Sequence, residues 1–483
     1  NLTLRNRALL AAMGTEYVEE DGSIGDRAIA YYEARAAGGA GMIVLETSSI
    51  AWPFGMSMPR MLGLSSDDYI PGLKRLAERV QQHGCRIAAQ LNHSGKVSAH
   101  DVAEGRTLLV PSLPKRAAND MGDGLTMAEM ANFVRSAGPD GKGPRFKEME
   151  QSDIDWVVDC FASAARRVME AGFDAIELHA GHGYLLSSFL SPYANRRDDD
   201  YGGNLENRAR LLLNVVAAIK REIGDDFPIV VRLDAHEYRT EGGITLNDAV
   251  RVAVLLEQAG CHAIDVSAYS NNSAIGFTEG PLVHQPGGYI DFAKAIKAAV
   301  SIPVIAVGRI EPDVAERHIA HGDFDFLAMG RKLLADPDLP NKLKDGRAET
   351  IRPCIYCYVC VSQIFINKSL RCAVNPETGY EQDQRHLPMA ENPKRILVVG
   401  GGPAGMEAAR VLAERGHRVQ LWEREPQLGG TLRVAALAYE PNGRLISYLE
   451  QGLYAAGVEV CLEREATVEA LVNAGCDDVV LAL

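Results

Sequence analysis

Residues 171–178 read AGFDAIEL and residues 259–266 read AGCHAIDV, so one short unit occurs twice in the chain. Looser copies are GAGMIVL at 39–45 and HGDFDFL at 321–327. In each copy a helical pattern ends near a glycine, the residue best suited to the left-handed conformation that follows a helix. The apolar run after it is short and nearly continuous, which is typical of a strand buried on both faces.

This repeat predicts eight strands that alternate with helices. The strands are expected at 8–12, 41–46, 85–91, 174–179, 228–233, 262–267, 303–307 and 324–329, and the helices at 26–37, 66–83, 151–171, 205–224, 246–258, 290–299 and 312–320. Strict alternation indicates a parallel sheet. Eight units in under 350 residues favour a (β/α)₈ TIM barrel over an open doubly wound sheet. We therefore predict an α/β chain whose residues 1–345 form a catalytic TIM barrel.

The longest interruption of the repeat lies at 115–150 and is rich in Gly, Asp, Lys and Met. It follows the third strand, so we expect it on the carboxyl-terminal face of the barrel, where active sites form. Two interpretations of this segment remain open: it is a lid over the substrate, or it is a mobile surface loop without function.

Composition limits the classes of partner. The 483 residues exceed one compact core, and 47% hydrophobic with 24% charged residues is ordinary for a soluble enzyme. No apolar run reaches the roughly 18 residues that a membrane span needs. The net charge of −14 disfavours nucleic acid and anionic membranes. We expect a small-molecule substrate and a cytoplasmic location, because the nine cysteines do not resemble a disulfide scaffold. The oligomeric state is not defined by the sequence, and a homo-oligomer is compatible with it.

Two Gly-Arg pairs end the last two predicted strands: Gly308-Arg309 and Gly330-Arg331. In many barrels the loops at these two places bind a phosphate. Glycine permits close approach of the backbone, and arginine adds a bidentate charge partner. A bound phosphate group is therefore predicted.

The most specific motifs follow the third and fourth strands. They are QLNHSG at 90–95, HAGHGYL at 179–185, FLSP at 189–192, NRR at 195–197 and DYGGNLENR at 200–208. Together they resemble the signature of the old yellow enzyme family, over essentially all of residues 1–345. The resemblance implies an FMN-dependent oxidoreductase built on a TIM barrel.

The resemblance also implies which residues bind FMN. Gln90 and Arg232 would hydrogen-bond its pyrimidine edge. Ala12, Met13, Gly14 and Thr47 would line the isoalloxazine ring, and Gly308, Arg309, Gly330 and Arg331 would hold the phosphate. The last assignment agrees with the anion site predicted from the glycine and arginine pairs alone.

The resemblance further implies that His179 and His182 bind a substrate carbonyl oxygen and that Tyr184 donates a proton. Hydride addition to the β-carbon of an enone builds negative charge on that oxygen, and two imidazole donors would stabilise it. A phenol with a pKa near 10 can then protonate the α-carbon. The alternative is that the three rings only pack at the end of a strand.

Four cysteines fall close together at 354, 357, 360 and 372. Three thiolates spaced C-x₂-C-x₂-C, with a fourth from a separate turn, can hold a [4Fe–4S] cluster. We predict that Cys354, Cys357, Cys360 and Cys372 do so within a segment at 346–390. A structural Zn²⁺ site, which more often pairs two C-x₂-C knuckles, is the alternative.

A glycine-rich loop follows a buried strand in RILVVGGGPAG at 395–405. Its position between strand and helix, with an acidic residue after the next strand, is typical of dinucleotide binding. The candidate residues are Gly400, Gly402, Gly405, Glu423 and Gly430. The Gly429-Gly430 pair resembles FAD-binding domains, so residues 391–483 are predicted to begin a Rossmann-like FAD-binding domain. The chain ends in an apparent strand, so we expect this domain to be truncated.

Through the cysteines and the glycine-rich loop, the chain resembles the multidomain branch that includes 2,4-dienoyl-CoA reductase, 2-enoate reductase, bile-acid enone reductases and trimethylamine dehydrogenase. The favoured hypothesis is an ene-reductase with NAD(P)H as the donor, which the resemblance implies. A secondary or tertiary amine dehydrogenase is the alternative. The short cysteine spacing resembles that of the amine dehydrogenases and favours this alternative. Two features disfavour it: His179 stands where those enzymes usually carry Tyr, and no cysteine before Cys85 is present to form their covalent link to the flavin. A catalytically silent electron-transfer flavoprotein is a third hypothesis. The substrate itself is not defined.

Overall fold

The computed structural model describes residues 2–115, 127, 138–270, 286–384 and 387–483. The chain divides into two compact units. The first unit consists of Asn1–Gly330 and Tyr358–Arg371, and the second of Arg331–Cys357 and Cys372–Leu483. The cysteine-rich stretch is thus shared between the two units.

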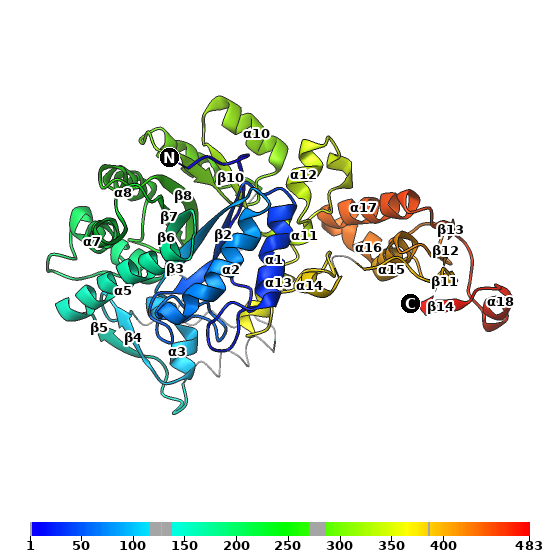
Figure 1. Ribbon diagram of the computed structural model, residues 1–483, viewed down its shortest axis with the longest axis horizontal. Coiled ribbons are helices and arrows are strands. Elements are labelled where there is room, and N and C mark those ends of the chain that lie inside the picture. The colour runs from blue at the N-terminus through cyan, green and yellow to red at the C-terminus, as the bar shows by residue number, and fades with distance from the viewer. Residues whose placement is uncertain (1, 116–126, 128–137, 271–285, 385–386) are drawn as a thin grey trace. The chain divides into compact units, whose positions relative to one another are not determined.

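Eight parallel strands close a barrel in the first unit (Figure 1). In order around the barrel they are β1 (Ala8–Leu10), β10 (Phe326–Met329), β9 (Val304–Ala306), β8 (Ala263–Ser270), β7 (Ile229–Tyr238), β6 (Ala175–Ala180), β3 (Arg86–Asn92) and β2 (Met42–Ser49). All eight predicted strands are confirmed. The open doubly wound sheet is excluded, because β1 pairs with both β2 and β10.

The seven predicted helices are also present. They are α1 (Asp26–Ala37), α2 (Ile70–Gln81), α5 (Gln151–Glu170), α7 (Leu205–Ile223), α8 (Leu246–Gln258), α9 (Ile290–Lys297) and α10 (Pro312–His321). Six of them bury several residues on one side, as α5 does with Ile154, Val157 and Phe161, whereas α10 buries Ala315 alone. The sequence also places their ends: the Asn204 side chain accepts a hydrogen bond from the Asn207 N–H at the start of α7.

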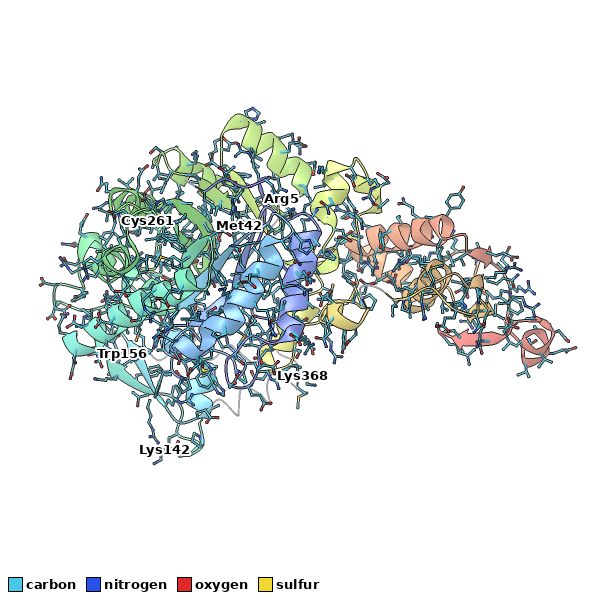
Figure 2. The ribbon with its side chains drawn as sticks, viewed as in Figure 1. Arg5, Met42, Lys142, Trp156, Cys261 and Lys368 are labelled. Atoms are coloured by element: carbon cyan, nitrogen blue, oxygen red, sulfur yellow. The ribbon has the colours of Figure 1, made fainter. Side chains whose placement is uncertain are left out.

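One residue from each strand fills a layer of the barrel interior. The layer contains Leu9, Met42, Ala88, Ala175, Val230, Ala263, Ile305 and Ala328, together with Ala11 and Val44. Leu2 and Leu4 pack against this layer. Arg5, labelled with Met42 in Figure 2, donates hydrogen bonds to the carbonyls of Ala36 at 2.6 Å and Ala40 at 3.0 Å. Side chains therefore fill the barrel at the amino-terminal ends of its strands, and a site can form at the carboxyl-terminal ends.

The predicted excursion at 115–150 is described only in part. β4 (Thr107–Val110), just before it, and β5 (Arg145–Glu148), near its end, form a two-stranded parallel sheet. Residues 116–126 and 128–137 lie outside the described part of the chain, and so does most of the segment expected to act as a lid. The sequence did not predict this small sheet. α3 (Ala99–Ala103) and α6 (Leu185–Leu190) are further short helices of this unit.

The second unit contains a parallel sheet in the order β13-β12-β11-β14, which confirms a Rossmann-like fold. Its strands are β11 (Arg395–Val399), β12 (Arg418–Trp422), β13 (Glu459–Cys461) and β14 (Asp478–Leu481), and its helices include α15 (Pro403–Glu414), α16 (Thr431–Ala438), α17 (Pro441–Ala455) and α18 (Val468–Asn473). Val398, Met406, Leu421 and Leu449 belong to its core. Shorter helices are α11 (Arg331–Ala335), α12 (Leu339–Lys344) and α14 (Glu381–Gln384), while α13 (Val359–Phe365) belongs to the first unit. Among the described helices, none has both the length and the apolar character that a membrane crossing requires.

Candidate active site at the carboxyl ends of the barrel strands

A buried chain of polar side chains crosses β2, β3 and β6. The Thr47 hydroxyl donates to Gln90 Oε1 at 2.5 Å, and Gln90 Nε2 donates to Glu177 Oε1 at 2.7 Å. On the next two strands, Arg232 Nη1 lies 3.3 Å from Asp265 Oδ2. The structure therefore brings together Thr47 and Gln90, which were expected to face one ligand.

Glu177 and Asp265 were not predicted as site residues. They occupy the same position in the two matching repeats, AGFDAIEL and AGCHAIDV, and an acidic residue inside a buried strand is the signal that was missed. Burial raises the pKa of both carboxyls, and the charge of Asp265 raises the pKa of Glu177 further, whereas Arg232 lowers both pKa values. Because β6 and β8 are the two neighbours of β7 in the barrel, the two carboxyls lie on either side of the Arg232 guanidinium.

Arg232 provides the test of whether FMN fits. Its side chain is buried, yet Nε and Nη1 have no hydrogen-bond partner among the described residues, although Asp265 Oδ2 forms an ion pair with Nη1 at 3.3 Å. Buried donors are nearly always paired, so unfilled donors indicate a ligand with acceptor oxygens. The carbonyl edge of a flavin pyrimidine has this chemistry, and the residues therefore fit the cofactor.

Three aromatic side chains gather where β6 ends. The ring centroid of His179 lies 4.9 Å from that of His182 and 4.6 Å from that of Tyr184, both edge-on. The Gly181 N–H donates to His179 Nδ1 at 3.3 Å, so in the neutral ring the proton is on Nε2. Burial lowers the pKa of both imidazoles well below the usual range, and the positive charge of Arg232 adds to this. Both rings are therefore neutral at pH 7.

Tyr184 keeps its proton at neutral pH. Burial raises the pKa of its phenol, although Ser57 and Arg232 act in the opposite direction. Ser57, from the loop after β2, was not predicted to be near the site. The structure thus brings two neutral imidazoles and one protonated phenol together where β6 ends: His179 is in the strand, His182 is in the loop after it, and Tyr184 is the N-cap of α6.

The glycines of the predicted phosphate loops are needed for close packing. A Cβ at Gly308 would lie 2.7 Å from the Tyr289 ring, and one at Gly330 would lie 2.5 Å from the sulfur of Met13. Gly308 and Arg309 both have positive φ, at 111° and 54°. Their roles in phosphate binding remain predictions.

The remaining residues of the predicted FMN set follow β1 and β10. Arg331 begins α11 in the second unit. Gly14 follows β1 with Ala12 and Met13, and a Cβ there would lie 2.6 Å from a carbon of Met58.

Three of the four motif cysteines lie in the second unit. The Tyr356 N–H donates to Cys354 Sγ at 3.4 Å, and the Cys372 thiol accepts from backbone N–H groups. Such N–H donors are typical around the sulfur ligands of iron clusters. Cys360 is buried in α13 of the first unit. No group of three or more His, Cys, Asp or Glu is close enough to hold a metal ion within the part of the chain that the structure describes. The cluster remains a prediction.

The glycine-rich loop of the second unit shows why its glycines are there. A Cβ at Gly405 would lie 1.9 Å from the Gly400 carbonyl oxygen, whereas one at Gly402 would meet no described atom within 4 Å. Gly402 is the N-cap of α15, so its open side is where a dinucleotide phosphate could approach. Gly430 comes from a later turn of the chain, and a Cβ at this position would lie 3.2 Å from Gly402 Cα.

The Glu423 carboxylate is already engaged. Oε2 accepts from the Gly401 N–H at 2.6 Å, and Oε1 accepts from the Glu425 N–H at 2.9 Å. These two bonds orient the carboxylate beside the loop, and its second lone pairs remain for a ribose hydroxyl.

Comparison with known proteins agrees with this geometry. The model of the NADH:flavin oxidoreductase / NADH oxidase family matches residues 1–350, and that of the NAD(P)-binding Rossmann-like domain matches residues 398–449. The chain is 40% identical over 490 residues to the NADH oxidase of Thermoanaerobacter brockii, with 100% of this chain and 71% of the relative covered.

Two solved structures are similar over nearly the whole chain. A 2-naphthoyl-CoA reductase in complex with 2-naphthoyl-CoA has a TM-score of 0.87 and 30% identity, covering 99% of this chain and 72% of that one. Histamine dehydrogenase from Rhizobium sp. 4-9 has a TM-score of 0.84 and 29% identity, covering 99% and 67%. The similarity therefore extends to reductases and to amine-oxidising enzymes.

Proposed function

The chain belongs to the NADH:flavin oxidoreductase / NADH oxidase family, and on this premise we propose that it is an NAD(P)H-dependent ene-reductase. It is a flavin-dependent oxidoreductase, and the proposal adds the reaction: reduction of a C=C bond conjugated to a carbonyl group. The observation that carries it is the set of two neutral imidazoles and one protonated phenol gathered where β6 ends. All three groups can donate hydrogen bonds or protons, which is what an enone acceptor requires.

FMN, held by Gln90, Arg232 and the loops after β1, β9 and β10, would supply a hydride to the β-carbon of the substrate. Side chains of the protein supply the hydrogen bonds to the carbonyl oxygen and the proton for the α-carbon. His179 Nε2–H and the His182 ring hold the carbonyl oxygen, where negative charge grows during the reaction. Both rings are neutral, so they stabilise this charge by hydrogen bonding without giving up a proton. Tyr184 then passes its phenolic proton to the α-carbon.

The proposal includes two further cofactors. Cys354, Cys357, Cys360 and Cys372 would hold a [4Fe–4S] cluster, and the loop of Gly400, Gly402, Gly405 and Gly430 with Glu423 would bind FAD. These groups would carry electrons between NAD(P)H and the barrel. Thiolate ligands suit a reducing compartment, which supports the cytoplasm as the location.

Amine oxidation is the second candidate, because histamine dehydrogenase is similar over 99% of the chain. The short C-x₂-C-x₂-C spacing also supports it. The donor at His179 counts against it, since an N–H donor would engage the nitrogen lone pair that an amine needs during oxidation.

Anaerobic half-reactions distinguish the candidates. The enzyme is reduced with NADH or NADPH and mixed with a panel of cinnamates, enoyl thioesters and cyclic enones, while the oxidised enzyme is mixed with a panel of tertiary amines. Flavin reoxidation by at least one enone is the expected result. Reduction by amines together with no reoxidation by any enone would show the second candidate to be right, and reducible flavin with neither reaction would show an electron-transfer protein.

A further inference from the structure

Two buried side chains from adjacent strands hold His182. Its backbone N–H donates to Asp234 Oδ2 at 2.6 Å, and its ring Nε2 lies 2.7 Å from Ser267 Oγ. Asp234 is on β7 and Ser267 on β8, and their exposed fractions are 1% and 2%. A residue on a loop is therefore fixed by two rigid elements.

The contact with Asp234 determines where the loop backbone lies. His182 and Gly183 have φ of 58° and 71°, a left-handed conformation that residues with side chains adopt rarely. The Asp234 carboxyl packs directly beneath this turn: a Cβ on Gly181 would lie 2.8 Å from its Oδ1, and the Ser187 hydroxyl donates to Oδ2 at 3.4 Å. The starting point of the His182 side chain is thus set by the barrel.

The contact with Ser267 concerns the ring. Nε2 is 2.7 Å from the Ser267 hydroxyl but 3.9 Å from Asp234 Oδ1, so the hydroxyl is its hydrogen-bond partner. Nδ1 has no hydrogen-bond partner among the described residues. A neutral imidazole has one proton, and the Ser267 hydroxyl can either donate to Nε2 or accept from it. A substrate oxygen can be bound by Nδ1 only when the ring proton is on Nδ1, and this requires the hydroxyl to donate to Nε2.

We propose that Ser267 is a positioning residue that selects the His182 tautomer with its proton on Nδ1, the nitrogen available to a substrate oxygen. The inference rests on the proposed function, because it concerns an imidazole assigned to the carbonyl oxygen. His179 has the opposite tautomer, through the Gly181 N–H on its Nδ1. The two rings would then present Nε2–H and Nδ1–H to one oxygen atom.

The test is a double-mutant cycle in single-turnover reactions of the whole enzyme with bound cofactors. Ser267→Ala, His182→Ala and the double variant are reduced anaerobically with NADH and reoxidised with the best enone of the panel. Ser267→Ala should lower the limiting rate of reoxidation about tenfold and leave flavin reduction unchanged. Its dissociation constant for the enone should change less than the rate, because the hydrogen bond strengthens as charge develops. The double variant should be no slower than His182→Ala alone.

Ser48→Ala is the matched control. Ser48 is equally buried in a barrel strand, and its hydroxyl donates to the Glu46 carbonyl at 2.8 Å, away from His182. It should reoxidise at the wild-type rate. A Ser267→Ala variant that keeps the wild-type limiting rate, or whose effect is fully retained when His182 is already alanine, would overturn the inference. A His182→Ala variant as fast as wild type would instead overturn the role of His182 in the proposed function, and this inference with it.

Discussion

The Gln90 amide donates to the Glu177 carboxyl at 2.7 Å, so a side chain assigned to the flavin is held in place by a buried acid. Glu177 also lies next to Asp265 and Arg232. Replacement of this carboxyl should therefore loosen the flavin site without touching the substrate loop.

Glu177→Leu is expected to weaken FMN binding about tenfold, since the acceptor that orients Gln90 is lost. The measurement is the dissociation constant of FMN by fluorescence after deflavination. Glu170→Gln, on the exposed surface of α5, serves as the control. Equal FMN affinity in the two variants would remove Glu177 from this role.

Tyr184→Phe should separate the two half-reactions. The variant lacks the proton donor, so enone turnover is expected to fall about 100-fold or more, while NADH still reduces the flavin at the wild-type rate. Stopped-flow absorbance of the flavin follows both steps. Undiminished enone turnover would show that the proton comes from another group.

A pH effect on stability is expected from Glu46. Its buried carboxyl accepts hydrogen bonds from the Thr15 N–H, the Thr15 hydroxyl and the Tyr32 hydroxyl. Burial nevertheless raises its pKa from 4.5 to about 7. The folded state therefore holds this proton more tightly than the unfolded state, and the contribution is full below pH 4.5 and lost as the pH rises towards 7.

The difference corresponds to on the order of 3 kcal/mol of unfolding free energy. The melting temperature of the wild type should fall between pH 5 and pH 7.5, and that of Glu46→Gln should fall less over the same range. Parallel curves for the two proteins would show that Glu46 ionises in the folded state as readily as in the unfolded state.

The two glycines of the dinucleotide loop should respond differently to alanine. Gly405→Ala places a Cβ 1.9 Å from the Gly400 carbonyl, which is backbone and cannot move aside, so a loss of stability of the second unit by several kcal/mol is expected. Gly402→Ala meets no described atom within 4 Å and should melt like the wild type while binding FAD more weakly. Calorimetry and FAD content measure the two effects. Equal melting of both variants would contradict this assignment.

Iron content tests the cysteine motif. Cys354→Ser should lose most of the iron bound by the anaerobically purified protein, because a hydroxyl is a poor substitute for a thiolate ligand. Cys160→Ser, in α5 and outside the motif, should retain it. Zinc in place of iron in the wild type would favour the structural alternative.

Much of the fold followed from local pattern. The repeat marked all eight strands and seven helices, because continuous apolar runs and helix-ending glycines are properties of neighbouring residues. The rings of His179, His182 and Tyr184 could likewise be predicted to lie near one another, since they fall within six consecutive residues.

What the sequence by itself determined is the barrel, the Rossmann-like unit and the residue types available for chemistry at their loops. Only the tertiary structure decided the partners: that Glu177 and Asp265 surround Arg232, that Asp234 lies beneath the His182 turn, and that Ser267 holds its ring. These contacts join residues between 33 and 88 positions apart, on or just after the three successive barrel strands β6, β7 and β8. No local pattern encodes such pairs, because strand register and closure, not sequence distance, set which side chains meet.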